Sequence, residues 1–508
     1  MKSLTTLLLL LIALTASASD FVPQRGCRVG KHNPQAVQRR TRLLQSTGNP
    51  YIGNRHQLVV LASFQDQDFA EDHPAALATW NNILNTENYT EGSFFGSVHD
   101  YFMAQSYGQF NLTFDLLIVE LPDVCWKYRS TYNHDEYSQY MVDDIVDVLQ
   151  TQSIDWSLYD WDGDSFIDQL LIIYAGKGMN AGGGSSTIWP HQWWLSRHEN
   201  LETADDEDFR SYRTVSVDAK EYYIDSYCCV QEVVNTSDVE TSFGTLCHEY
   251  SHCFGLPDFY EGSTSFVGEW DLMDYGNYSD RGFRPCGYSA HERMLMGWLT
   301  PTELTSPASI TDMPALCDEP QAYLIRNDGS ENEYYIVENR QQKGWDEKLP
   351  GSGIVIFHVD YDPSIWESSV EVTNSSSKKR YYIFPANNNS RLTYCAGWAY
   401  PYMVAGSSGN DSIANNCLTN TSKPAAKLNN ANTDGKLLMS KPITQLSIDA
   451  NGYASFVFRE EDLTSINDLT DGQPEEGVWF MLNGTRLINR PTTPGIYLYN
   501  GRKVLIGK

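Results

Sequence analysis

The chain has 508 residues, a length that suggests about three structural units. Hydrophobic residues make up 41% and aromatic residues 13%, which is enough apolar material for more than one core. The net charge is −29, because 36 Lys and Arg stand against 65 Asp and Glu. This acidity argues against nucleic acid and anionic membranes as partners. It either reflects a demand for calcium or only keeps the protein dispersed.

The N-terminus has the pattern of a secretory signal peptide over residues 1–18. Lys2 supplies the positive start, Leu7 to Leu14 form an apolar run, and Ala16-Ser17-Ala18 is a small-residue cleavage site. The run is too short to anchor the chain in a bilayer, and no later segment is long and apolar enough to span one. We therefore expect a secreted protein, with or without association to the cell surface.

The next segment, 19–45, is basic and differs from the acidic body that follows. We interpret it as a removable pro-segment with Arg39-Arg40 as a cut site; the alternative is a disordered tail. Cys27 within it could cap a metal as a thiolate and keep a zymogen silent, although a disulfide or a free thiol explains it as well. The even total of ten cysteines makes disulfides reasonable in an exported chain.

Residues 46–302 alternate apolar strand patterns with helical ones, which predicts an α/β domain. Strands are expected at 58–64 and 169–174 and a helix at 94–107. From 303 to 460 strand patterns dominate, as at 333–337 and 353–359, so we predict an all-β, sandwich-like domain. Residues 461–508 are interpreted as a polar linker and a short C-terminal hairpin tail, because Asn483-Gly484 and Asn500-Gly501 are strong hairpin turns.

The segment from Thr241 to Tyr260 carries a metal-binding pattern. Its apolar residues recur at helical spacing, and Thr241 or Ser242 is expected to cap the helix. His248 and His252 are four residues apart, so that both imidazoles can reach one Zn²⁺ from the same helix face. Glu249 is angled away from the metal and can act on a water molecule.

A third ligand is expected just beyond the helix. Gly255 can adopt the left-handed conformation that ends a helix, and the chain can then bring Asp258 back toward the metal. Glu269 and Glu292 remain alternative ligands. A fourth position stays open for water, as a catalytic site requires.

The stretch HEYSHCFGLPD has the extended HExxHxxGxxD form of the immune inhibitor A-like metallopeptidase family, a metzincin-like group. GEWDLMDYGNY resembles the segment of that family that carries the Met-turn, with Met273 beneath the metal. Similar stretches fall in the expected order between about residues 55 and 460. The resemblance implies a zincin-type catalytic domain, a following β-domain and the activity of a secreted zinc endopeptidase.

The residues permit peptide-bond hydrolysis in proteins or peptides. Glu249 can take a proton from the attacking water and pass it to the leaving amine. Tyr275 and Tyr278 are candidate donors to the oxyanion, and ordinary packing explains them equally well. The competing hypothesis is a non-catalytic secreted binding or adhesion protein in which a zinc-bearing helix is only structural.

A second cation site is predicted where acids alternate at positions 1, 3, 5 and 9 of an EF-hand-like loop: Asp160, Asp162, Asp164 and Asp168. The loop departs from the EF-hand pattern, because position 6 is Ser165 and position 12 is Leu171. We interpret it as a structural Ca²⁺ site, with a solvated acidic turn as the alternative. The final hairpin, GIYLYNGRKVLIGK, resembles C-terminal sorting tails that some secretion systems recognise; the alternative is a hairpin that only stabilises the chain.

Overall fold

The computed structural model describes residues 49–130, 137–197, 212–234, 241–261, 264–366, 378–405, 412–459, 479–482, 486–487, 490–499 and 502–506. The predicted signal peptide, the pro-segment with Cys27, most of the polar linker and both Asn-Gly turns lie outside these residues. The described part divides into two compact units. Unit 1 comprises residues up to Trp298 with Trp345–Lys348 and Asp362–Lys378, and unit 2 comprises Leu299–Gly344, Leu349–Tyr361 and Lys379–Lys508.

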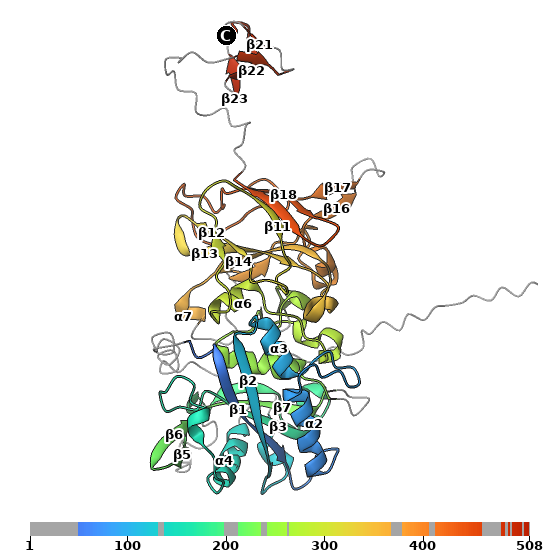
Figure 1. Ribbon diagram of the computed structural model, residues 1–508, viewed down its shortest axis with the longest axis vertical. Helices are drawn as coiled ribbons and strands as arrows, with labels where there is room; N and C mark the ends of the chain where they lie inside the picture. The colour runs from blue at the N-terminus through green and yellow to red at the C-terminus, as the bar shows by residue number, and fades with distance from the viewer. Residues whose placement is uncertain are drawn as a thin grey trace, which may run out of the picture. The chain divides into compact units, whose positions relative to one another are not determined.

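Unit 1 is built on a five-stranded sheet of mixed direction (Figure 1). The strand order is β2-β1-β3-β7-β4, in which only β4 runs antiparallel to its neighbour. The strands are β1 (Gly53–Ser63), β2 (Phe110–Glu120), β3 (Leu170–Lys177), β7 (Ser226–Val233) and β4 (His191–Trp194). The strands predicted at 58–64 and 169–174 are therefore β1 and β3, and both are buried because helices cover the two faces of the sheet.

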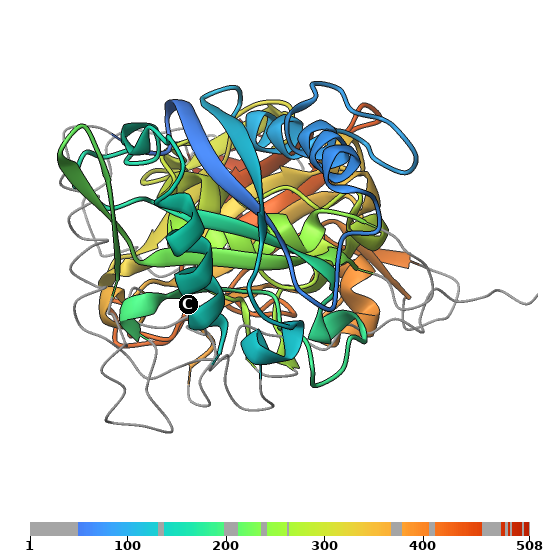
Figure 2. The same cartoon turned by 90° about the horizontal axis from the view of Figure 1, so that it is seen from below.

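Successive strand residues point to opposite faces, so β1 contributes to two different cores. Leu58 and Val60 pack with the apolar residues of α4 (Ser138–Leu149) on one face. On the other face, Gln57 accepts a hydrogen bond from Tyr250 in α5 (Gly244–Ser251) at 2.6 Å. Figure 2 shows α4, in teal, crossing the near face of the sheet. The α/β character expected from the sequence is thus confirmed for this unit.

The remaining helices of unit 1 are short. The predicted helix at 94–107 is α3 (Val98–Gln105), which begins at a capping box formed by Ser97 and Asp100. The others are α2 (His73–Asn85), α6 (Ala290–Leu295) and α7 (Pro363–Trp366), with the hairpins β5 (Arg213–Val217)/β6 (Lys220–Ile224) and β8 (Tyr260–Glu261)/β9 (Thr264–Ser265). Single 3-10 turns complete the unit: η1 (Cys125–Tyr128), η2 (Trp156–Leu158), η3 (Met179–Ala181), η4 (Leu195–Arg197), η5 (His252–Phe254), η6 (Gly268–Trp270), η7 (Gly276–Gly282) and η8 (Gly344–Lys348).

Unit 2 consists of β-strands and one 3-10 turn, η9 (Leu392–Gly397), among the described residues. Its five-stranded sheet has the order β10-β12-β13-β14-β15. These strands are β10 (Thr302–Glu303), β12 (Tyr323–Asn327), β13 (Ser330–Arg340), β14 (Gly353–Asp360) and β15 (Tyr381–Ile383). Smaller sheets are formed by β11 (Ala308–Met313), β19 (Ala454–Phe458) and β18 (Ile443–Ile448), and by β16 (Tyr402–Ala405) with β17 (Ser412–Asn415).

The C-terminal residues form a sheet of their own with the order β21-β20-β22-β23. It contains β20 (Trp479–Met481), β21 (Arg486–Leu487), β22 (Gly495–Tyr499) and β23 (Arg502–Ile506). The antiparallel pairing of β20 with β21 and of β22 with β23 is what two Asn-Gly hairpins would produce.

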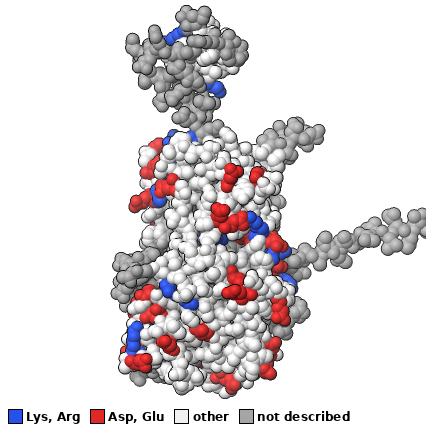
Figure 3. Space-filling view, viewed as in Figure 1, with Lys and Arg blue, Asp and Glu red and all other residues white. Residues whose placement is uncertain are grey.

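The cysteines, the helices and the surface charges of the described residues can be compared with the sequence expectations. The nine cysteines within the described ranges are all free thiols, so the expected disulfides do not form among them. Burial raises the pKa of the Cys228 and Cys247 thiols. Both thiols therefore stay neutral and pack in the interior as small apolar groups. No helix in the described ranges combines the length and apolar character needed to cross a membrane. On the face shown in Figure 3, acidic side chains are spread widely and no continuous basic patch appears.

Candidate metal centre

The helix α5 carries the two histidines, and all eight of its residues are buried. Tyr250 packs against Phe102, Phe114 and Phe254, so the predicted apolar stripe faces the sheet and α3. His248 and Glu249 lie on the side that borders a cavity. The helical spacing of the motif therefore holds in the fold.

The predicted cap of this helix is wrong. The N-cap is Phe243, which provides no side-chain hydrogen bond. The Thr241 hydroxyl donates to the backbone oxygen of Glu232, and the Ser242 hydroxyl donates to that of Arg281. Both hydroxyls thus bind neighbouring segments and are not available to the first N–H groups of α5.

Four potential ligand atoms converge beside α5. Nε2 of His248 lies 3.1 Å from Oδ1 of Asp258, and Nε2 of His252 lies 3.6 Å from the same oxygen. Oε2 of Glu249 is 3.9 Å from Nε2 of His252. The atoms of His248, Glu249 and His252 are close enough together to hold a metal ion. The structure thus brings the predicted residues His248, Glu249, His252 and Asp258 together beside α5.

Backbone carbonyls orient both imidazoles. Nδ1 of His248 donates to the oxygen of Leu272 at 2.9 Å, and Nδ1 of His252 donates to that of Leu256 at 2.7 Å. A carbonyl oxygen can only accept, so each Nδ1 carries a hydrogen. When the ring is neutral, Nε2 therefore carries a lone pair and faces Asp258. This neutral form of imidazole is the one that binds a metal.

The site favours positive charge. Burial lowers the pKa of His248, but the hydrogen bond to Asp258 and the charges of Glu249 and Asp258 raise it to about 9. Burial lowers the pKa of His252 to about 4, against the attraction of Asp258. One imidazolium is thus stabilised where two carboxylates are buried, and the same negative surroundings suit a dication.

Gly255 ends the helical segment as predicted, with a left-handed φ of 80°. The following turn places Asp258, which is fully buried, against the two histidines. The alternative ligands lie in other surroundings. Glu292 accepts hydrogen bonds from Ser289 in the capping box of α6, and Glu269 is exposed in η6.

Met273 is fully buried in a turn between η6 and η7. Its backbone nitrogen donates to Oδ1 of Asp271 at 2.9 Å, and its oxygen accepts from the nitrogen of Phe259 at 2.9 Å. The preceding residue, Leu272, supplies the carbonyl that orients His248. The turn therefore supports the histidine through its backbone.

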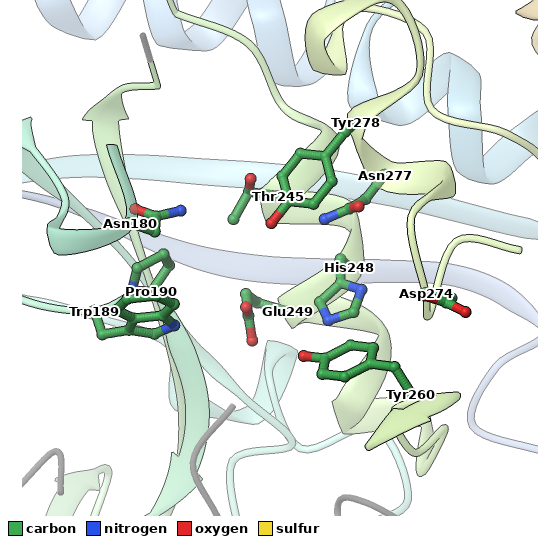
Figure 4. Close-up of a pocket in the computed structure, with 10 residues that line it drawn as sticks. All are labelled: Asn180, Trp189, Pro190, Thr245, His248, Glu249, Tyr260, Asp274, Asn277 and Tyr278. Carbon is green, nitrogen blue, oxygen red and sulfur yellow. The ribbon is translucent and has the colours of Figure 1, made fainter. Parts of the chain in front are cut away.

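A small cavity opens beside Glu249 (Figure 4). In the figure the Glu249 carboxylate lies between Trp189 and Pro190 on one side and the His248 ring on the other. Of the two predicted oxyanion donors, Tyr278 lines this cavity and Tyr275 is not among its lining residues. The full lining comprises Asn180, Trp189, Pro190, Thr245, His248, Glu249, Tyr260, Asp274, Asn277 and Tyr278.

Several of these residues escaped the sequence analysis. Asn180, Tyr260 and Asn277 reach the cavity from three separate segments, η3, β8 and η7. A single amide or aromatic residue has no spacing signature that could reveal it. Thr245 could have been found, because it precedes Glu249 by one helical turn and so shares its face.

The acidic loop brings together three of its four carboxylates. Asp160, Asp162 and Asp168 offer oxygens within 4.8 Å of one another. Asp164 instead accepts the backbone N–H of Phe166 at 2.8 Å. Ser165, which replaces the EF-hand glycine, adopts a left-handed φ of 72°, and Gly163 in the same loop has a φ of 79°.

Part of the chain is similar to a known protein family. Residues 64–297 match the family model of the immune inhibitor A peptidase M6, catalytic domain. This segment contains the two histidines, Glu249, Asp258 and Met273. The segment is similar to a metallopeptidase catalytic domain, and the resemblance noted in the sequence is confirmed over this range. The resemblance expected as far as about residue 460 extends beyond this match.

Two groups of curated proteins are similar at modest identity. The pre-pro-metalloprotease PrtV of Vibrio cholerae is 27% identical over 154 residues, which cover 27% of this chain and 15% of the relative. Immune inhibitor A of Bacillus thuringiensis subsp. alesti is 28% identical over 167 residues, which cover 30% of this chain and 22% of the relative. The chain thus spans less than a quarter of the length of these relatives.

Proposed function

We propose that the protein is a secreted zinc-dependent endopeptidase that hydrolyses peptide bonds of proteins, with Glu249 as general base. The observation that carries the proposal is the approach of Oδ1 of Asp258 to Nε2 of His248 and of His252, at 3.1 and 3.6 Å. Two imidazole nitrogens and one carboxylate oxygen are a ligand set of catalytic zinc sites. A zinc-bearing adhesion protein would need no carboxylate base beside a cavity.

The residues present fit a zinc ion. His248, His252 and Asp258 would hold it, and the carbonyls of Leu272 and Leu256 already fix both rings. When bound, zinc would supply Lewis-acid chemistry and make water more acidic. The cavity borders this side of the helix at His248 and Glu249.

The chain's own residues would then manage protons and orientation. Glu249 is 4% exposed and borders the cavity, so its carboxylate can accept a proton from the attacking water and return it to the leaving amine. The Tyr278 hydroxyl would donate a hydrogen bond to the substrate oxygen on which negative charge develops. Tyr275 has no place on the cavity wall and is not proposed for this role.

The substitution Glu249→Gln tests the mechanism, because it removes the base and keeps the shape. We expect casein cleavage to fall by at least about 100-fold, the lower range for a general base, with unchanged zinc content and thermal unfolding. Glu221→Gln, on an exposed strand, is the matched control. Chelator-insensitive cleavage, or full activity of Glu249→Gln, would refute the proposal.

We also propose the organisation expected from the sequence: signal peptide 1–18, pro-segment 19–45, a zincin-type catalytic domain 46–302, a sandwich-like β-domain 303–460 and a linker with sorting tail 461–508. The name of the V. cholerae relative includes both a pre- and a pro-segment, which supports the first two. N-terminal sequencing of the exported protein tests the two cleavage positions. Deletion of residues 477–508 tests whether the tail is needed for export or for surface association.

Finally, we propose that Asp160, Asp162, Asp164 and Asp168 bind a structural Ca²⁺ ion. The side chain of Asp160 is 3% exposed, and its Oδ1 has no hydrogen-bond partner. Burial and the charges of the other loop acids raise the pKa of Asp168 well above its usual range. Buried carboxylates that repel one another are stabilised by a cation at their centre.

A further inference from the structure

Asn180 and Asn277 both line the cavity and both have a carboxamide oxygen without a hydrogen-bond partner, but only Asn277 is buried. Asn277, in η7, is only 2% exposed, yet its Oδ1 has no hydrogen-bond partner. Most buried carboxamides in proteins are hydrogen-bonded. Other described side chains, such as Gln192 and Gln231, also have an atom without a partner, but they do not line the cavity. Figure 4 shows the Asn277 carboxamide beside the Tyr278 ring and above the His248 ring, turned toward the cavity.

The backbone of Asn277 is held in place from two sides. A Cβ on Gly244, at the start of α5, would lie 1.9 Å from the backbone oxygen of Asn277. A Cβ on Gly276 would lie 2.2 Å from Sγ of Cys286, and the nitrogen of Gly276 donates to the oxygen of Asp271 at 2.8 Å. Only glycine fits at either position, so η7 packs directly on the metal-binding helix. The carboxamide is therefore presented to the cavity from a rigid support.

The neighbouring groups indicate what the carboxamide would bind. Glu249 and Thr245 border the cavity from α5, and the Tyr278 hydroxyl reaches it from the same turn as Asn277. A peptide bond that enters this space loses water from both its C=O and its N–H, and each then requires a partner. A primary carboxamide offers one donor group and one acceptor and so complements a backbone amide.

We propose that Asn277 is a substrate-binding residue whose carboxamide hydrogen-bonds the backbone of the peptide next to the cleaved bond. This inference rests on the proposed peptidase function and extends it, because it assigns recognition to the main chain of the substrate. The missing partner of Oδ1 in the free protein is then supplied by the substrate. The loss on substitution should not depend on substrate side chains.

The test compares Asn277→Leu, which keeps the volume and removes both hydrogen-bonding groups, with Asn81→Leu on the exposed face of α2 as the matched control. We expect kcat/KM for quenched fluorescent peptides to fall about 5- to 30-fold in Asn277→Leu, the loss of one or two hydrogen bonds. The fall should be similar for peptides of different sequence. Zinc content and thermal unfolding should match those of the unsubstituted protein.

Peptides with a single thioamide in place of one backbone carbonyl near the cleaved bond locate the contact. For one thioamide position, kcat/KM of the unsubstituted protein should fall relative to the ordinary peptide. For the same position, kcat/KM of Asn277→Leu should not fall further, because the substitution has already removed that hydrogen bond. Unchanged kcat/KM in Asn277→Leu, additive losses at every position, or a loss that follows zinc content would overturn the inference. If the unsubstituted protein itself shows no chelator-sensitive cleavage, the proposed function fails instead, and the two failures are distinct.

Discussion

Nε2 of His248 lies 3.1 Å from Oδ1 of Asp258, although a helix end and a turn separate the two residues along the chain. Asp258 is fully buried, and the His248 ring can offer it a positive charge. A buried carboxylate against an imidazole is costly unless a positive charge compensates it. The pair therefore joins the helix to the turn that follows it at the point where a metal would bind.

Removal of the Asp258 carboxylate should cost metal affinity directly. We expect Asp258→Ala to bind zinc more than about 100-fold more weakly, beyond the loss seen for groups that only orient a ligand, and to lose proteolysis with it. Competition with a fluorescent chelator measures the affinity. Glu269→Ala, exposed in η6, is the control and should keep its zinc. Normal zinc binding by Asp258→Ala would assign the third ligand to another residue.

The two tyrosines after Met273 should behave differently. Tyr278 lines the cavity and Tyr275 does not, so we expect Tyr278→Phe to lower kcat by about 100-fold and Tyr275→Phe to change it less than about twofold. Steady-state kinetics on one peptide substrate separates the two variants, with KM nearly constant in both. Equal losses, or a larger loss in Tyr275→Phe, would exclude Tyr278 as the oxyanion donor.

Calcium should stabilise unit 1 through the acidic loop. A ligand present at 100 times its dissociation constant adds about 2.7 kcal/mol to the free energy of unfolding, and we expect calcium to approach this value. Asp160→Asn should abolish the gain, because it removes the carboxylate whose Oδ1 is buried without a partner. Thermal unfolding with calcium or with chelator measures it, and Glu319→Gln in unit 2 is the control. A calcium response that survives in Asp160→Asn would place the ion elsewhere.

A buried pair in unit 2 should make that unit sensitive to acid. Burial raises the pKa of Glu333, but the hydrogen bond from His358 at 2.7 Å and those from Asn429 and Asn327 lower it below its usual value. A carboxyl group with a lowered folded-state pKa stabilises the fold above its unfolded pKa of about 4.3, and this stability is lost as the pH falls through the lowered value. The change should therefore lie below about pH 5.

Glu333→Gln should flatten this acid dependence and reduce stability at pH 7 by about 1–3 kcal/mol, since charge-assisted hydrogen bonds are lost. Hydrogen exchange of β13 and β14 between pH 3 and 7 localises the effect to unit 2. The exposed Glu319→Gln should retain the acid transition of the unsubstituted chain. The same steep loss of protection in Glu333→Gln would show that another group is responsible.

Features that depend on neighbours along the chain could be predicted from the sequence. The four-residue spacing of His248 and His252 places both rings on one helix face whatever surrounds the helix. Gly255 follows at the position where a left-handed residue ends it, and its φ of 80° agrees. The buried strands β1 and β3 could be predicted from short apolar runs, because a strand that is covered on both faces is apolar at successive positions.

Features that depend on contacts between distant segments required the tertiary structure. The Thr241 and Ser242 hydroxyls bind Glu232 and Arg281, so neither caps α5. Only the packing of η7 on Gly244 shows that Asn277 and Tyr278 share the cavity with Glu249 while Tyr275 lies outside it. Helical periodicity determines which side chains share a face. Which residues stand opposite that face depends on how the chain returns to it, and no local pattern encodes that return.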